Sequence, residues 1–184
     1  TPPSSASARP GDKILVSGYL GDHGVAILAA REKLPLRVDI RSDCAPLHSL
    51  VAALVQVAGS NVHVLRDPTR GGLASALNEI ATDSGVDMTI TQEALPIRPE
   101  VRGVCDILGL DPLCMANEGK LIACLAPRSA QEALRAARLH PLGANAAIVG
   151  EVMQSSHPRV HVRTELGTSR ILSMPAGELL PRIC

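Results

Sequence analysis

Residues 62–85, VHVLRDPTRGGLASALNEIATDSG, decide the fold class of this chain. Residues 62–65 are typical of a strand, and a turn containing Pro68 and two glycines follows them. Residues 73–82 then carry apolar side chains at helical spacing, and Ser84 and Gly85 end that helix. Residues 86–90 alternate as a second strand does. The stretch therefore predicts a sheet with helices packed on it.

The same mixture extends in both directions from this stretch. We expect further strands at 14–16, 120–125, 147–153, 160–162 and 169–172, and further helices beginning near residue 22 and spanning 46–57, 99–108 and 129–139. Because short strands dominate after residue 143, strict alternation is broken and we predict an α+β fold, a mixed sheet layered with helices. Residues 1–12 are interpreted as a linker, 13–174 as one domain and 175–184 as a mobile tail.

Composition excludes several classes of function. The chain has 184 residues, 46% of them hydrophobic, 18 Lys plus Arg against 18 Asp plus Glu, one Tyr, and neither Phe nor Trp. Balanced charge and missing aromatic side chains argue against nucleic-acid binding, which favours basic surfaces and stacking platforms. No apolar run is long enough to span a membrane, and residues 1–13 do not resemble a signal peptide. Five cysteines without a C-x-x-C pair indicate reduced thiols, so we expect a soluble, cytoplasmic protein without a structural metal site.

The turn between strand 62–65 and helix 73–82 is a candidate anion site. Backbone N–H groups at a helix start attract anions, and the turn adds an arginine, a hydroxyl and two glycines that admit close approach. The candidate residues are Asp67, Thr69, Arg70, Gly71 and Gly72. The same glycines also suit an ordinary turn, and the pattern is neither a P-loop nor a G-x-G-x-x-G motif.

Other candidates lie in short polar segments. Glu118 stands just before an apolar strand, where it could overhang a cleft and act as a base, although Asn117 and Gly119 also suit a plain turn. His23 at a helix start is interpreted as structural. Cys184 ends the chain, where a thiol could be carried into another site. The remaining cysteines lie in or beside apolar segments and are interpreted as packed small hydrophobic residues: Cys44, Cys105, Cys114 and Cys124.

Nine segments resemble, in order, the HypE family of hydrogenase maturation factors. They are GDKILVSG (11–18), LGDHG (20–24), SDC (42–44), RDPTRGG (66–72), ALP (94–96), VRGVC (101–105), ANEGKL (116–121), HPLG (140–143) and LPRIC (180–184). That family is similar in architecture to the PurM (AIR synthase-related) superfamily, whose members have two α/β domains. The resemblance corresponds to the second domain only, so we expect this chain to be a piece of a longer protein whose ATP-binding N-terminal domain is missing here.

The resemblance implies a role for the chain's end. In HypE the C-terminal cysteine receives a carbamoyl group from HypF, and ATP-dependent dehydration turns it into a thiocyanate, the cyanide source for nickel-iron hydrogenases. Matching the motifs gives the acceptor role to Cys184, a base role to Glu118 and a cleft contact to residues 67–72. It also implies ATP and Mg²⁺ bound mainly by the absent half, transfer to a HypC–HypD complex, a homodimer of the full-length protein and an inactive isolated fragment.

Two other interpretations stay open on the sequence. The chain could belong to another PurM-like ATP-dependent enzyme, such as a selenophosphate synthetase or a thiamine phosphate kinase, although a tail ending in cysteine is not expected there. It could also be a non-catalytic interaction module whose tail docks a partner. Removing residues 181–184 separates the last possibility from a carrier role.

Overall fold

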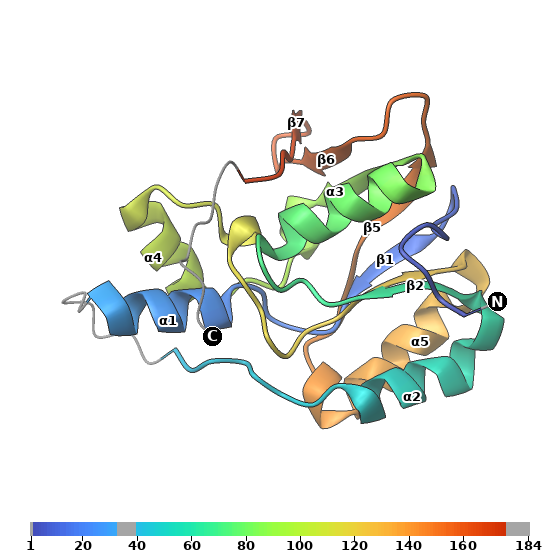
Figure 1. Cartoon of the computed structure of the whole chain (residues 1–184), viewed down its shortest axis with the longest axis horizontal. Coiled ribbons are helices and arrows are strands. Elements are labelled where there is room, and N and C mark those ends of the chain that lie inside the picture. Colours follow the sequence, from blue (N-terminus) through green and yellow to red (C-terminus); the bar gives the residue numbers. More distant parts are fainter. Residues whose placement is uncertain (1, 33–39, 176–184) are drawn as a thin grey trace.

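A mixed seven-stranded sheet forms the centre of the computed structural model, which describes residues 2–32 and 40–175 (Figure 1). The strand order is β2-β4-β1-β5-β3-β6-β7, and every neighbouring pair is antiparallel except β3 and β6. The strands are β1 (Lys13–Val16), β2 (Val62–Arg66), β3 (Val86–Thr91), β4 (Ile122–Leu125), β5 (Ala147–Gln154), β6 (Val160–Arg163) and β7 (Ser169–Ile171). The predicted α+β class is confirmed.

Helices cover both faces of the sheet in the part of the chain that the structure describes. They are α1 (Asp22–Glu32), α2 (His48–Ala58), α3 (Gly72–Ser84), α4 (Pro99–Leu108) and α5 (Pro127–Leu139). Four short 3₁₀ turns connect them: η1 (Gly59–Asn61), η2 (Gln92–Ala94), η3 (Pro112–Cys114) and η4 (Pro141–Gly143). Each predicted helix and strand is present, with ends within about two residues of the structure, which is the usual uncertainty of element boundaries.

The core is aliphatic and lies in two layers because strand side chains alternate between faces. In β1, Ile14 and Val16 pack with α3 on one face, while Leu15 packs with α2 and α5 on the other. Figure 1 shows α3 on one side of the sheet and α2 with α5 on the opposite side. A third, smaller cluster joins α1 to α4 through Val25 and Val101.

The opening residues correct the sequence prediction. Residues 2–12, interpreted as a linker with order beginning near Lys13, instead pack on the domain. Ser4 N–H donates to the carbonyl of His63 at 3.1 Å, Ala8 is 6% exposed, and the Asp12 side chain is buried. The error arose because a Pro- and Ser-rich segment satisfies its backbone groups on neighbouring elements, which composition alone does not reveal.

The sheet geometry gives the molecule two distinct strand ends. Since β1 and β2 are both antiparallel to β4, the ends of β1 and β2 meet the start of β4. We call this the Val16 end, and we call the opposite one, where β1 and β2 begin and β4 finishes, the Lys13 end. Within residues 2–32 and 40–175, no helix is long and apolar enough to cross a membrane.

Candidate functional site

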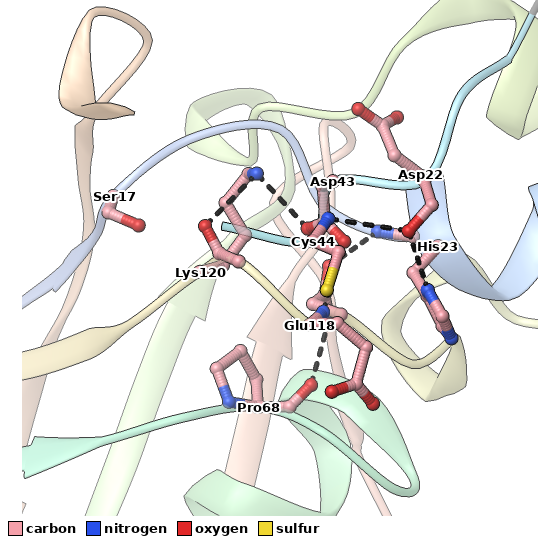
Figure 2. A network of polar contacts seen from close by, with 12 residues as sticks. Ser17, Asp22, His23, Asp43, Cys44, Pro68, Glu118 and Lys120 are labelled. Carbon is pink, nitrogen blue, oxygen red and sulfur yellow. Dashed lines mark hydrogen bonds and ion pairs between the residues drawn. The ribbon is translucent and has the colours of Figure 1, made fainter. Parts of the chain in front are cut away.

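Four segments converge at the Val16 end. They are the turn into α1 (residues 17–24), the stretch 40–45, the loop from β2 to α3 (67–71) and the loop before β4 (115–121). Antiparallel pairing of β4 with β1 and β2 brings three of them together. Figure 2 shows the polar contacts that link them.

Asn117 is the buried hub of this region. Its side chain is 1% exposed, its Oδ1 accepts from the Gly21 N–H at 2.8 Å, and its Nδ2 donates to the carbonyls of Pro68 at 3.0 Å and Met115 at 3.1 Å. The Asn117 N–H donates to the same Pro68 carbonyl at 3.2 Å. A buried amide with all these partners fixes three loops relative to one another.

Glu118 follows this hub directly and is exposed to solvent. Its backbone N–H donates to Asp43 Oδ1 at 3.0 Å. The second oxygen of Asp43, Oδ2, lies 3.0 Å from the Lys120 ammonium, and the two side chains are only 3% and 13% exposed. Asp43 therefore contacts the loop on both sides of Gly119, at the Glu118 N–H and at the Lys120 ammonium. These contacts fix the backbone from which the Glu118 carboxylate extends.

Gly119 is required by the same contact. A Cβ at this position would lie 1.7 Å from the Asp43 carbonyl oxygen and 2.9 Å from the Ala45 nitrogen. Real Cβ atoms do not approach a backbone this closely, so only glycine lets residues 43–45 lie against the loop. Of the two interpretations of Asn117-Glu118-Gly119, a plain turn and a presented base, the geometry accommodates both.

A short polar chain lies beside the loop. His23 Nδ1 is 2.9 Å from Ser42 Oγ, and Ser42 Oγ accepts from the Cys44 N–H at 3.3 Å. Both contacts are exposed (Figure 2). His23 thus anchors the stretch 42–44 to the start of α1, in agreement with its structural interpretation.

The loop after β2 lies next to the hub through Pro68. Asp67 and Arg70 are exposed, and Thr69 accepts from the Gly72 N–H through its carbonyl at 3.1 Å. Gly71 and Gly72 both have positive φ, at 69° and 59°. A Cβ on Gly72 would meet the Met115 carbonyl at 2.4 Å. Only glycine therefore lets the backbone at 113–115 lie this close to the loop.

Gly71 has a neighbour that bears on the tail. A Cβ on Gly71 would lie 3.3 Å from Cγ of Pro175, which is the last residue the structure describes. The described chain therefore finishes against the loop from β2 to α3. Cys184 lies outside the described residues.

The cysteines differ in accessibility. Cys105 and Cys124 are buried and Cys114 is half-buried, whereas Cys44 is exposed, so its interpretation as a packed hydrophobic residue is wrong. Cys44 is exposed because it lies in the stretch 43–45, which crosses Gly119 at the surface rather than packing in the core. Burial, aided by the charge of Asp111, raises the pKa of the Cys105 and Cys114 thiols to about 11. Burial also raises the pKa of Cys124 well above its ordinary value.

Asp43 and Lys120 are site residues that sequence reasoning missed. Both belong to motifs noted above, SDC and ANEGKL, but their spacing of 77 positions gives no local signal that they pair. Among the described residues, no three His, Cys, Asp or Glu side chains gather in an arrangement that could hold a metal ion. The arrangement offers one exposed carboxylate on a fixed loop and one exposed thiol held next to it.

Comparison with known proteins finds relatives that are about twice as long as this chain. Carbamoyl dehydratase HypE of Rhizobium leguminosarum bv. viciae is 51% identical over 180 residues, covering 98% of this chain and 51% of the relative. The Escherichia coli protein of that name is 45% identical over 174 residues, covering 95% and 51%. The chain thus spans about half the length of the curated relatives it matches.

Solved structures agree. A crystal structure of hydrogenase maturation protein HypE is similar with a TM-score of 0.93 at 48% identity, covering 99% of this chain and 58% of that one. The HypE–HypF complex gives 0.90 at 44%, covering 94% and 55%. Thiamine-monophosphate kinase from Aquifex aeolicus, with a TM-score of 0.56 at 21% identity, shares the fold alone.

The family profile described as AIR synthase related protein, C-terminal domain, matches residues 9–163. This range contains the loop from β2 to α3, the ion pair of Asp43 with Lys120, and Glu118. The chain therefore belongs to the family of AIR synthase related proteins and forms their C-terminal domain.

Proposed function

We propose that this chain is the half of a carbamoyl dehydratase that carries the acceptor thiol, Cys184, and the base, Glu118. One observation carries the proposal: the described chain finishes with Pro175 against Gly71, in a loop bonded through Pro68 to the residue before Glu118. Cys184 is the ninth residue after Pro175, and nine extended residues span up to ~30 Å. The tail is therefore long enough for Cys184 to reach Glu118.

The proposed dehydration needs a base close to the carbamoylated thiol. Dehydration of a thiocarboxamide, R–S–C(=O)–NH₂, to R–S–C≡N removes the oxygen and both nitrogen protons. Phosphorylation of the oxygen supplies its leaving group, and a carboxylate within hydrogen-bond reach accepts a proton from nitrogen. Glu118 is suited to this because it is exposed and its backbone is fixed by Asp43.

We expect this half alone not to hold the nucleotide. A Cβ on Gly72 would meet the backbone at 113–115, so protein already makes the close approach at this glycine, and the described residues contain no cluster of metal-ligating side chains. A crystal structure of hydrogenase maturation protein HypE that is similar to this chain is a complex with ATP. We expect ATP and Mg²⁺ to be bound mainly by the other half of the longer relatives, with exposed Asp67 and Arg70 and half-buried Thr69, beside Gly71 and Gly72, facing the cleft between the halves.

The proposal extends to partners. A HypE relative forms a complex with HypF, and the carbamoyl group is expected to come from a protein of that kind. The product thiocyanate would pass to a HypC–HypD complex. Homodimer formation by the full-length protein is part of the same proposal.

The base assignment is tested in the full-length protein. Cys184 is carbamoylated with HypF, ATP is added, and thiocyanate on the tail is followed by mass spectrometry in single turnovers. Glu118→Gln should lower the rate by ~10²–10⁴, the range for loss of a general base. Glu165→Gln, at an exposed glutamate in the turn between β6 and β7, is the matched control and should keep the parent rate. Parent-like turnover by Glu118→Gln would remove Glu118 from the mechanism.

The 184-residue chain alone should not catalyse the ATP-dependent dehydration. The same assay on this chain, with HypF, carbamoyl phosphate and ATP, should leave Cys184 without thiocyanate. Thiocyanate formation would show that the chain contains a complete active site and would contradict the proposed division of labour.

A further inference from the structure

The Lys13 end holds a buried carboxylate–imidazole pair that the proposed function does not use. Asp12 Oδ2 lies 2.8 Å and Oδ1 3.0 Å from His63 Nδ1, and the two side chains are 2% and 9% exposed. Asp12 Oδ2 also accepts from the Arg9 N–H at 2.9 Å. An ionised carboxylate can only accept, so His63 Nδ1 carries the proton and the ring orientation is fixed.

The outer nitrogen of His63 is left free. Two carboxylate oxygens, of Asp22 and Asp43, are the buried side-chain atoms without a hydrogen bond in the described part of the chain. His63 Nε2 has no hydrogen-bond partner among these residues and is not one of the two, so it reaches solvent. His63 also lines a pocket at this end of the sheet.

Two cationic side chains line that pocket. It has a volume of about 270 Å³ and lies between the opening segment, the start of β2 and the start of α5. Arg9 and Arg128 line it, and no carboxylate is among its described lining residues. The Arg9 side chain has no hydrogen bond or ion pair with the described residues, and Arg128 bonds only the neutral Asn61 Oδ1.

These features specify a ligand. The Asp12 carboxylate behind His63 offsets one positive charge, but two guanidinium groups leave an excess of positive charge that attracts an anion. Guanidinium groups bind phosphate oxygens well, and a P–OH or P–O⁻ group satisfies Nε2 whether the ring is neutral or charged. At ~30 Å³ per water the pocket holds about nine waters, which leaves room for a tetrahedral oxyanion. Ser7 and Ser60 also line it and can add hydroxyl donors.

We propose that the pocket formed by His63, Arg9 and Arg128 binds a phosphate group, either free or as a monoester. The site lies at the opposite strand end from Glu118 and is independent of the proposed dehydratase function. Because Arg9 belongs to the opening segment, occupation of the site ties residues 2–12 to the start of α5.

The test follows the histidine ring nitrogens of the ¹⁵N-labelled 184-residue chain by NMR. Potassium phosphate is added against potassium chloride at constant ionic strength. The His63 ring signals should shift and saturate, with half-saturation at ~1–10 mM, the affinity of a few charge-assisted hydrogen bonds near a surface. His140, whose two ring nitrogens already contact Ser49 and Leu142, should not shift. A His63 shift that does not saturate, or that chloride reproduces, would overturn the proposal.

Variants locate the site. Arg9→Gln and Arg128→Gln should each raise the half-saturating phosphate concentration about tenfold. Arg135→Gln, the same change at an exposed position further along α5, should leave it unchanged. Equal effects of Arg135→Gln and Arg128→Gln would mean unspecific charge attraction and would contradict the site.

A histidine variant and a second ligand complete the experiment. His63→Asn keeps an amide donor for Asp12 and removes Nε2, so it should weaken binding about tenfold; if it fails to fold, the exposed arginine variants still decide. Glycerol phosphate is compared with inorganic phosphate. Equal half-saturation assigns the site to the phosphate group alone, a tenfold preference for the ester assigns it to monoesters, and binding of neither refutes the proposal.

Discussion

A buried aspartate lies at each end of strands β1 and β2, and the two aspartates have different structural roles. At the Lys13 end, Asp12 holds His63 and the Arg9 N–H, and the opening segment closes over the pair. At the Val16 end, Asp43 holds Lys120 and the Glu118 N–H, and the next side chain stays exposed. The first arrangement fastens a segment to the domain, whereas the second fixes a loop while leaving its carboxylate in solvent. One buried charge therefore fastens a chain segment, and the other fixes the loop that carries the proposed base.

The largest effects should come from removing either carboxylate. Asp12→Ala and Asp43→Ala each leave a buried cationic or imidazole partner and a backbone N–H unpaired, which should lower the free energy of unfolding by about 3–5 kcal/mol. Urea titration of the 184-residue chain measures this. Asp83→Ala, at an exposed position near the end of α3, is the control and should change stability by less than ~0.5 kcal/mol. Wild-type stability of either buried variant would mean that the pair contributes nothing to that end.

An asparagine at each end differs in burial and in the number of its contacts. Asn117→Ala removes three side-chain hydrogen bonds in a fully buried position and should cost about 3 kcal/mol. Asn61→Ala at the Lys13 end loses contacts to Ser129 and Arg128 near solvent and should cost about 1 kcal/mol. Chemical denaturation of both variants gives the difference, and equal losses would show that Asn117 is not a hub.

Glycines test the close approach at the Val16 end. Gly119→Ala places a Cβ against the Asp43 carbonyl and should cost about 2–3 kcal/mol while disturbing the Glu118 loop. Gly103→Ala, in α4 with open space around the new Cβ, should instead stabilise by about 0.5–1 kcal/mol. Thermal unfolding distinguishes the two signs. A neutral Gly119→Ala would mean that the stretch 43–45 moves away freely.

The smallest effect concerns alkaline pH. The Cys105 and Cys114 thiols have their pKa raised from 9 to about 11 in the folded chain, so they ionise in the unfolded state first. Stability is therefore fully present below pH 9 and falls as pH rises from 9 to 11, by about 1 kcal/mol per thiol at pH 10. The double variant Cys105→Ala, Cys114→Ala should lose less stability between pH 9 and 10 than the parent. An identical loss in both proteins would contradict the raised pKa.

Local pattern predicted the elements well because apolar periodicity and Gly or Pro boundaries are local properties. The helix over 99–108 was predicted at its observed limits, since Pro99 starts it and Gly109 follows its last residue. The pairing of β3 with β6, the packing of residues 2–12 and the contact between Asp43 and Lys120 depend on residues far apart in the sequence. Cys44 was misjudged for the same reason, because its exposure depends on how the stretch 43–45 crosses Gly119.

Glu118 and the loop from β2 to α3 were identified as candidates from residue types and the family resemblance. Their relation in space was not predictable, because Asn117 joins them through a buried amide rather than through neighbouring positions. The Asp12–His63 pair was also missed. A histidine in a strand and an aspartate before another strand give no sign of each other in sequence.

The proposed function requires the tail thiol to visit the loop that carries Glu118, and Cys44 beside that loop can report this. Mild oxidation of the 184-residue chain with diamide should form an intramolecular Cys44–Cys184 disulfide within minutes, because a short tail gives its end a millimolar effective concentration near the loop. Mass spectrometry of peptides under non-reducing conditions identifies the bond, and Cys44→Ser should abolish it. Cys184 that stays unpaired, or that forms disulfides only with other chains while Cys44 remains reactive, would show that the tail does not reach this end. That result would contradict the proposed function.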